Sequence, residues 1–215
     1  MQIKILIADD HAIVREGLQM ILEAQCDIIT VGTAADGRDA ISKAETLHPD
    51  LIIMDISMPG MNGIEATRVI KIRVPAVKVV MLSMHHTREH IFRAMEAGAY
   101  GYVLKESAGA EIAKAVRAVM KGQHYFGKGV DNQITSHFKE NINTHKSPLN
   151  SLSQRELEVL QMVVEGKTSV EIAKNLTLSP KSVETYRSRL MLKLGVSNIP
   201  SLVKFALLHG ITSPN

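Results

Sequence analysis

The sequence predicts two domains of different fold classes: an α/β domain with a doubly wound, five-stranded parallel sheet, and a small all-α domain joined to it by a linker. Three observations predict this arrangement. Short apolar runs alternate with segments of helical period in the first part of the chain, the last part has helical periods only, and the stretch between them has no sustained period. The 215 residues are enough for two small domains that each bury a core.

Five short apolar runs are the expected strands. Because they are nearly continuous rather than alternating, they indicate strands that are covered on both faces, as parallel strands are. They span Ile3–Ala8, Asp27–Val31, Leu51–Met54, Val77–Leu82 and Tyr100–Leu104.

Five helices are expected between and after these strands. In the first of them, the apolar residues expected at helical spacing on one face are Ile13, Val14, Leu18, Ile21 and Leu22. The predicted helices span His11–Ala24, Arg38–Leu47, Gly63–Ile72, Arg88–Ala97 and Ala108–Met120. Strands that alternate with helices imply a parallel sheet, whose functional side chains gather at the carboxyl ends of the strands.

The α/β pattern ends near Gly122. We interpret residues 123–148 as a linker, because Gly, Asn, His and Ser are scattered through it, with one short helix near Asn132–Lys139. The expected domains are therefore 1–122 and 149–215.

The last domain is predicted to hold four helices with well-marked starts. Capping boxes at Ser153–Glu156 and Thr168–Glu171 open the first two. Ser179-Pro180 opens a third helix that runs to Gly195, and a fourth spans about Ser201–His209. The brief turn between the second and third helices predicts a helix-turn-helix.

Composition narrows the class of protein. Hydrophobic residues make up 45% of the chain, too many for a disordered protein, and no apolar run approaches the roughly 20 residues of a membrane span. The single cysteine, Cys26, fits a reducing compartment, and the first residues lack a signal-peptide layout, so we expect a cytoplasmic protein. The net charge of +3 is carried by residues 149–215, which hold eight Lys and Arg against five Asp and Glu. A mildly basic domain is weak support for a nucleic-acid partner.

Acidic residues converge at the ends of the predicted strands. Asp9 and Asp10 follow the first strand and Asp55 the third, while Ser83 and Lys105 follow the fourth and fifth. Crowded carboxylates raise each other's pKa unless a cation is bound, and hard ions such as Mg²⁺ prefer oxygen ligands. A carboxylate nucleophile, a metal, a hydroxyl and a lysine together predict a phosphoryl-transfer site. The alternative is that these residues only cap the following helices. Capping could explain a single aspartate at a strand end, but it does not explain all five positions together.

This ordered set, with the segment MDISMPGMNG at Met54–Gly63, resembles the flavodoxin-like receiver domain of bacterial response regulators over residues 1 to about 122. The resemblance implies that Asp55 accepts a phosphoryl group from a sensor histidine kinase and that Lys105 and Ser83 bind its oxygen atoms. It also implies that Tyr102 is the switch aromatic. The implied Mg²⁺ ligands are Asp10 directly, Asp9 through water, Asp55, and the carbonyl of Ser57. His85 matches a position that tunes loss of the phosphoryl group.

The last domain resembles the LuxR-type helix-turn-helix over roughly residues 150–211, on Leu152–Leu160, Glu171–Ala173 and Lys193–Val196. The whole chain thus resembles the NarL/FixJ subfamily. That resemblance implies a transcription regulator that binds double-stranded promoter DNA as a homodimer when phosphorylated, through the recognition helix Pro180–Leu194. Base-reading positions map onto Glu184, Thr185 and Ser188, and phosphate contacts onto Lys181, Tyr186, Arg187, Arg189 and Lys193.

Two departures from that family remove cations. Thr168-Ser169-Val170 replaces the common Ser-Asn-Lys, and Ile199-Pro200 replaces a polar or basic pair. Both predict weaker non-specific DNA binding with a shallower salt dependence.

We therefore predict a phosphorylation-controlled regulator of transcription rather than an enzyme. The enzyme alternative is a Mg²⁺-dependent phosphatase, but the usual aspartate-based phosphatases carry a second acid two residues after the nucleophile, where this chain has Ser57. A third hypothesis keeps both domains and makes DNA binding independent of phosphate. The intact acidic set argues against it.

Overall fold

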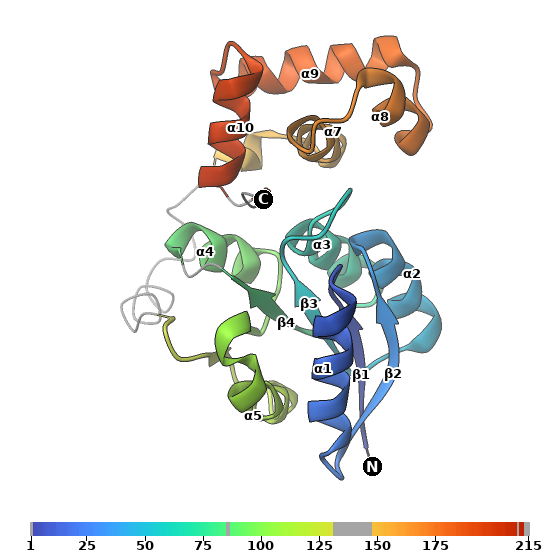
Figure 1. The fold of residues 1–215 in the computed structure, drawn as a ribbon, viewed down its shortest axis with the longest axis vertical. Helices are drawn as coiled ribbons and strands as arrows, with labels where there is room; N and C mark the ends of the chain where they lie inside the picture. Colours follow the sequence, from blue (N-terminus) through green and yellow to red (C-terminus); the bar gives the residue numbers. More distant parts are fainter. Residues whose placement is uncertain (1, 85–86, 131–147, 210, 213–215) are drawn as a thin grey trace. The chain divides into compact units, whose positions relative to one another are not determined.

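The computed structural model of the chain describes residues 2–84, 87–130, 148–209 and 211–212. The chain divides into two compact units, Met1–Ile142 and Asn143–Asn215 (Figure 1). The helix expected near Asn132–Lys139 and the side chain of His85 lie outside the described residues.

The first unit is built on a parallel sheet, which confirms the predicted fold class. Its strands are β1 Ile3–Ala8, β2 Ile28–Ala34, β3 Leu51–Asp55, β4 Lys78–Ser83, β5 Gly101–Leu104 and β6 Tyr125–Phe126. The strand order is β2-β1-β3-β4-β5-β6, and every neighbouring pair is parallel.

The prediction of five strands was wrong, because β6 adds a sixth. It lies in the segment that the sequence assigned to the linker, and it pairs through Gly101 with Tyr125 and through Tyr102 with Phe126. Two residues make too short a run to give a periodic signal. Pairing with β5 alone defines this strand, so its residues carry little local evidence of it.

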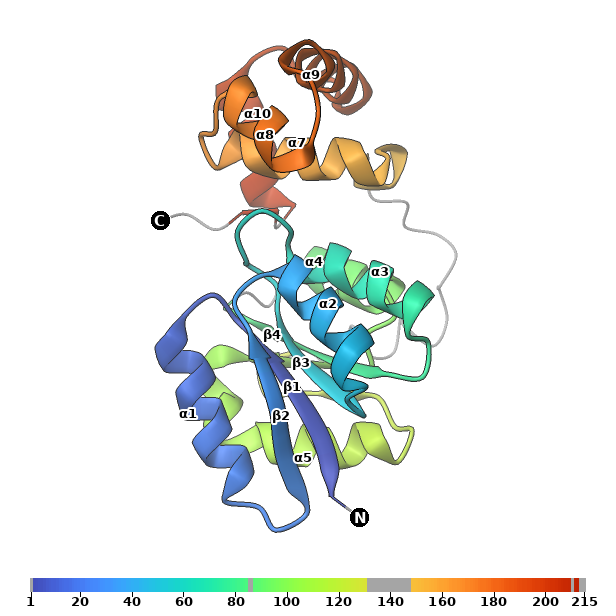
Figure 2. The ribbon, with the colours of Figure 1, turned by 90° about the vertical axis from the view of Figure 1, so that its right-hand side faces the viewer.

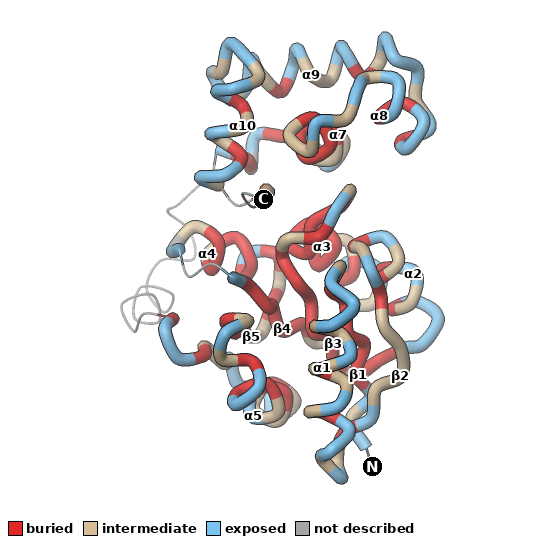
Figure 3. Tube along the Cα trace, in the orientation of Figure 1, coloured by how far each residue is buried: buried red, intermediate tan, exposed pale blue. Residues whose placement is uncertain are grey.

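Helices cover both faces of the sheet, as Figures 1 and 2 show. The helices are α1 Ala12–Glu23, α2 Gly37–Leu47, α3 Gly63–Arg73, α4 Arg88–Glu96 and α5 Ala108–Met120. Residues of α1 and α5 share one core with Ile5 and Ile7, and residues of α2, α3 and α4 share the other with Leu6 and Ala8. Alternate residues of β1 thus enter opposite cores, and the central strands are buried on both sides (Figure 3).

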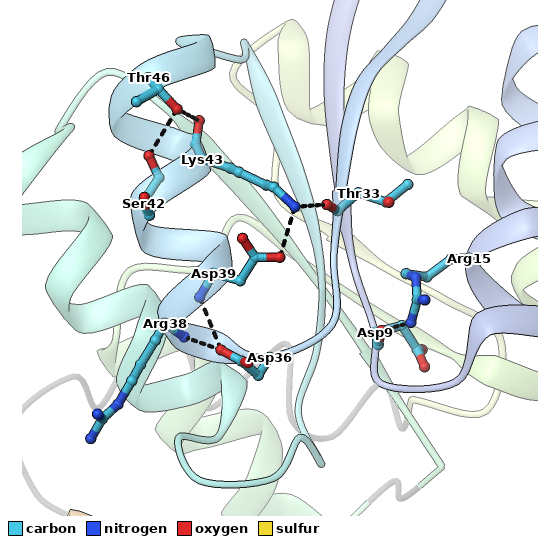
Figure 4. Close-up of polar contacts among 9 residues, drawn as sticks. All are labelled: Asp9, Arg15, Thr33, Asp36, Arg38, Asp39, Ser42, Lys43 and Thr46. Atoms are coloured by element: carbon cyan, nitrogen blue, oxygen red, sulfur yellow. Dashed lines mark hydrogen bonds and ion pairs between the residues drawn. The ribbon is translucent and has the colours of Figure 1, made fainter. Parts of the chain in front are cut away.

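Local sequence fixes where the helices begin. Asp36 caps α2 by accepting hydrogen bonds from the backbone nitrogens of Arg38 and Asp39 (Figure 4). Gly63 opens α3 against the end of β3, where a Cβ atom would lie 2.0 Å from the carbonyl oxygen of Asp55. The position of Asp55 therefore depends on a glycine at residue 63.

The second unit is all-helical, as predicted. After the 3₁₀ turn Pro148–Ser151 it contains α7 Gln154–Val164, α8 Ser169–Leu176, α9 Pro180–Leu194 and α10 Ile199–Leu208. Both predicted capping boxes are present, and Ser179 caps α9 with proline in its first turn. The start of α10 differs from the expected Ser201, because Asn198 caps the helix by accepting a hydrogen bond from the Ser201 nitrogen.

Apolar side chains from all four helices form one core in this unit, including Leu160, Ile172, Leu190 and Leu202. Within the described ranges, no single helix is long and apolar enough to cross a membrane. The pair α9 and α10 passes by length and composition only when the two are joined, and it bends by 63° at the break between them.

Candidate acidic site and nucleic-acid interface

The strand order of the first unit brings its five candidate residues to one edge of the sheet. Ala8 pairs with Met54, so the next residue on each strand, Asp9 and Asp55, are also neighbours. Ser83 ends β4, and Lys105 follows β5 directly in a 3₁₀ turn, Lys105–Ser107. The sheet therefore brings together residues that are far apart in the sequence.

Lys105 lies between two buried carboxylates. Its Nζ atom is 2.8 Å from Asp9 Oδ2 and 3.0 Å from Asp55 Oδ2. Asp9 is fully buried and Asp55 nearly so, whereas the Lys105 side chain is 12% exposed. One ammonium group thus offsets part of the negative charge that the fold buries at this edge.

Asp10 and His11 form the outer rim of the cluster. His11 Nδ1 lies 2.7 Å from Asp10 Oδ1 and 3.3 Å from Asp9 Oδ1, and the His11 backbone nitrogen donates a hydrogen bond of 2.9 Å to Asp9 Oδ1. Ligand atoms of Asp9, Asp10, His11 and Asp55 all lie within 4.8 Å of one another. The rim is more exposed than the two inner carboxylates.

Burial is the largest influence on the acidity of Asp55. Together with the charge of Asp9 it raises the pKa of Asp55 to about 6, although Lys105 acts in the opposite direction. Burial on its own would lower the pKa of Lys105, but the charges of Asp55 and Asp9 outweigh burial and raise that pKa. The carboxyl groups of Asp9 and Asp55 therefore repel each other, and Lys105 stays charged.

The donor set suits a hard divalent cation. Among the described residues, no group makes a well-angled hydrogen bond to Asp9 Oδ2, Asp10 Oδ1 or Asp55 Oδ2, although all three atoms are buried. Three carboxyl groups face one ammonium, so the cluster holds more acidic than basic groups. An acidic set of oxygen ligands is the type that Mg²⁺ prefers.

Ser83 and Tyr102 connect this edge to the interior of the sheet. Both side chains are buried, and the hydroxyl of Ser83 is hydrogen-bonded to the phenol of Tyr102. Burial raises the pKa of Tyr102 above its ordinary value, so the phenol stays protonated. Ser57 lies in the half-buried loop just after Asp55.

One residue at this edge was not predicted from the sequence. Arg15 donates a hydrogen bond of 2.7 Å from Nη1 to the carbonyl oxygen of Asp9 (Figure 4). The bond ties the first turns of α1 to the end of β1. The spacing of the sequence could have indicated this contact, because Arg15 lies one helical turn after His11 and so on the same face of the helix.

Helix α9 presents a polar surface in the second unit. Val183 and Leu190 are buried in the core. Six of the eight residues predicted to contact nucleic acid are exposed: Lys181, Glu184, Thr185, Ser188, Arg189 and Lys193. In Figure 3, exposed residues recur along this helix between buried ones. Within its own unit, α9 thus has an exposed polar face and a buried apolar face.

Two basic residues of α9 make contacts within the protein. Arg187 is half-buried, and its Nη1 atom lies 3.0 Å from Glu184 Oε1. Lys193 Nζ lies 2.7 Å from Glu156 Oε2, in the capping box of α7. Lys181, Arg189 and Lys193 are the exposed basic residues of the predicted set in α9, and of these Lys193 pairs with Glu156.

The chain matches two family models. Residues 5–117 match the model of the response regulator receiver domain, and residues 150–206 match the model of the bacterial regulatory proteins of the luxR family. Together the two matches include every candidate residue named above.

Single proteins resemble the chain over nearly its whole length. The oxygen regulatory protein NreC of Staphylococcus aureus is 40% identical over 209 residues, which are 95% of this chain and 96% of NreC. The RcsB response regulator of Salmonella typhimurium superposes with a TM-score of 0.66 at 30% identity, over 97% of this chain and 98% of RcsB. A complex of RcsB with DNA superposes with a TM-score of 0.60 at 29% identity, over 97% of this chain and 99% of that one.

Proposed function

Because the chain belongs to the two-component response regulators that join a receiver domain to a LuxR-family DNA-binding domain, we propose that phosphoryl transfer to Asp55 controls its binding to promoter DNA. The phosphoryl donor is a sensor histidine kinase. In this proposal residues 1–122 are the receiver, 123–148 the linker and 149–215 the DNA-binding domain, although β6 extends the sheet into the linker segment. The protein acts in the cytoplasm, where both the kinase domain and the chromosome are accessible.

The observation that carries the proposal is the position of Lys105 between Asp9 and Asp55. A carboxylate oxygen of Asp55 attacks phosphorus, an O–P bond forms, and the N–P bond of the donor's phosphohistidine breaks as its imidazole leaves. Lys105 Nζ, already 3.0 Å from Asp55, is placed to pair with an oxygen of the transferred group.

A Mg²⁺ ion would be held by Asp10, Asp55, the Ser57 carbonyl and, through water, Asp9. Bound there, it would neutralise charge on the transferring phosphoryl group. Arg15 and the His11 backbone hold the end of β1 in place, which keeps Asp9 and Asp10 directed at the same edge.

Ser83 and Tyr102 are placed to relay the change. The Ser83 hydroxyl is hydrogen-bonded to the buried Tyr102 phenol. We expect this hydroxyl to turn toward the new phosphoryl oxygens, because phosphorylation adds about −1.5 to −2 charge and strong acceptors. The phenol then loses a partner and the packing around it changes, which biases a two-state element.

The output in this proposal is DNA binding by a homodimer through α9. Glu184, Thr185 and Ser188 lie on the exposed face for reading bases, and Lys181 and Arg189 contact phosphates. Arg187 acts mainly within the protein, since it lies against Glu184.

The test uses the full-length protein with acetyl phosphate and Mg²⁺. We expect one phosphoryl group per chain by intact mass, none in Asp55→Asn, and the normal amount in the control Asp39→Asn, an aspartate of α2 away from the cluster. Binding to duplexes selected from genomic fragments should tighten after phosphorylation in the wild type and the control only. Multiple turnover of phosphoesters would favour the phosphatase alternative. Equal DNA binding by Asp55→Asn and wild type, with and without donor, would favour phosphate-independent output.

A further inference from the structure

A small side-chain network joins α8 to α9 on the surface assigned to DNA. It consists of Ser169, the first residue of α8, and of Glu184 and Arg187, which lie three residues apart in α9. Arg187 Nη1 donates to Glu184 Oε1 at 3.0 Å and to Ser169 Oγ at 3.1 Å. The Ser169 hydroxyl donates to the same Glu184 oxygen. Two donors from two helices therefore meet at one carboxylate oxygen.

The network leaves the other oxygen of Glu184 available. The Glu184 side chain is 58% exposed and that of Arg187 is 28% exposed, so the carboxylate faces solvent while the guanidinium is partly covered. Within the part of the chain that the structure describes, no hydrogen bond reaches Glu184 Oε2. A glutamate on an exposed helix ordinarily samples several rotamers. Here one oxygen is fixed, and the second has a defined direction.

The contacts also reduce an electrostatic cost. A carboxylate brought into a groove is repelled by the phosphates on either side. Arg187 carries a positive charge against this carboxylate and so offsets part of that repulsion. Ser169 supports both partners from a separate helix, and it stands at one of the positions where the sequence departs from the common Ser-Asn-Lys.

We propose that Ser169 and Arg187 are positioning residues that fix the Glu184 carboxylate to accept a hydrogen bond from an exocyclic base amine, and so make the protein select cytosine at one position of its site. Cytosine presents its N4 amine in the major groove, and glutamate accepts from it. The inference rests on the proposed function, because it requires α9 to lie in a DNA groove. A surface ion pair without any role in recognition is the competing explanation.

The test measures base preference rather than affinity alone. The full-length protein, treated with acetyl phosphate and Mg²⁺, selects duplexes from a randomised pool, and Glu184→Ala identifies the base pair whose preference depends on Glu184. Four duplexes that differ at this base pair are then titrated with wild type, Ser169→Ala, Ser169→Thr and a control. The control is Ser201→Ala, an exposed serine of α10 outside the network.

We expect Ser169→Ala to lower the discrimination for cytosine by about threefold to tenfold, which is the effect of one lost hydrogen bond. Preferences at other base pairs and the salt slope should not change. Ser169→Thr, which keeps the hydroxyl, should restore discrimination, and Ser201→Ala should match wild type. In the Glu184→Ala background, Ser169→Ala should have no further effect on base preference.

Three results would overturn the inference: an unchanged base profile in Ser169→Ala, an equal loss of affinity for all four duplexes, or an effect of Ser169→Ala that persists without Glu184. If Ser169→Ala does not fold, the comparison of Ser169→Thr with Arg187→Met decides in the same way, since only the threonine variant should keep the preference. A wild-type protein that selects no sequence at all would instead contradict the proposed function.

Discussion

The acidic cluster of the receiver and the exposed face of α9 are built in opposite ways. In the cluster, backbone topology does most of the positioning, because the pairing of parallel strands places residues 9 and 55 side by side whatever their side chains are. On α9, side-chain contacts do the positioning, as Arg187 and Glu184 show. The cluster is buried and charged, whereas the α9 face is exposed and polar.

This difference determines how much each region depends on single charges. Removing one partner of a buried charge cluster leaves the others without compensation, which costs several kcal/mol. An exposed pair is screened by water and contributes about 1 kcal/mol or less. Substitutions in the receiver should therefore affect folding and chemistry together, and those on the exposed face of α9 should affect recognition with little effect on folding.

The largest expected effect is that of Lys105→Met. This substitution leaves Asp9 and Asp55 without the ammonium that lies 2.8 and 3.0 Å from them. We expect the free energy of unfolding without divalent cations to fall by about 3 kcal/mol, at the low end for a buried pair because the pocket is partly open to water. Saturating Mg²⁺ should restore part of this loss. Urea unfolding followed by circular dichroism measures both values.

The matched control for this prediction is Lys43→Met. Lys43 pairs with Asp39 at 2.7 Å, but both side chains are more than a third exposed, so we expect a loss below about 1 kcal/mol. A Lys105 variant that loses no more stability than the Lys43 variant would contradict the contrast between buried and exposed charges.

A smaller effect is expected for Glu156, a buried acid in the DNA-binding unit. Burial raises the pKa of Glu156, but Lys193 and the hydrogen bonds from Ser153 outweigh burial and hold that pKa below its ordinary value. The ionised group therefore stabilises the folded state above a pH of about 4.3, and this contribution is lost as the pH falls through the lowered pKa. We expect Glu156→Gln to cost about 1 kcal/mol at pH 7.

The difference in unfolding free energy between wild type and Glu156→Gln should shrink below the lowered pKa of Glu156 and remain constant near neutrality. Glu171→Gln, in the exposed capping box of α8, is the control and should have the smaller effect at neutral pH. Thermal unfolding over a pH series gives both comparisons. A difference for Glu156→Gln that does not depend on pH would show that its charge is irrelevant to stability.

Strands β1 to β5, the helices around them and the residues of the acidic cluster could be predicted from the sequence because each has a local signal. Asp55 ends a buried apolar run, and Ser153 and Glu156 have the spacing of a capping box. Strand β6 has no such signal, because Tyr125 and Phe126 are defined as a strand by β5. The fold class can thus be predicted from local patterns, whereas the last strand of the sheet, β6, depends on its pairing with β5.

The partners of surface side chains were less accessible to sequence analysis. Lys193 looked like a phosphate contact, yet it lies against Glu156, which is 37 residues away in the sequence. Ser169 had no predicted role, and it contacts both Arg187 and Glu184. A long side chain can reach several partners at similar energy. Helical spacing therefore predicts the face of the helix on which the residue lies, but not the group that its side chain contacts.

The smallest expected effect is that of Val170→Lys, which restores one cation to α8. Val170 is 67% exposed, so the new lysine should disturb no packing. If α8 lies along the DNA backbone, the added ammonium releases about one more counterion, and the slope of log affinity against log salt should steepen by about 0.9. Fluorescence anisotropy with a non-specific duplex, from about 50 to about 200 mM salt, measures this slope. Base preference should not change, because a phosphate contact carries no sequence information. A variant that changes base preference while the slope stays the same would place Val170 beside the bases, and the proposed orientation of α8 and α9 on DNA would then be wrong.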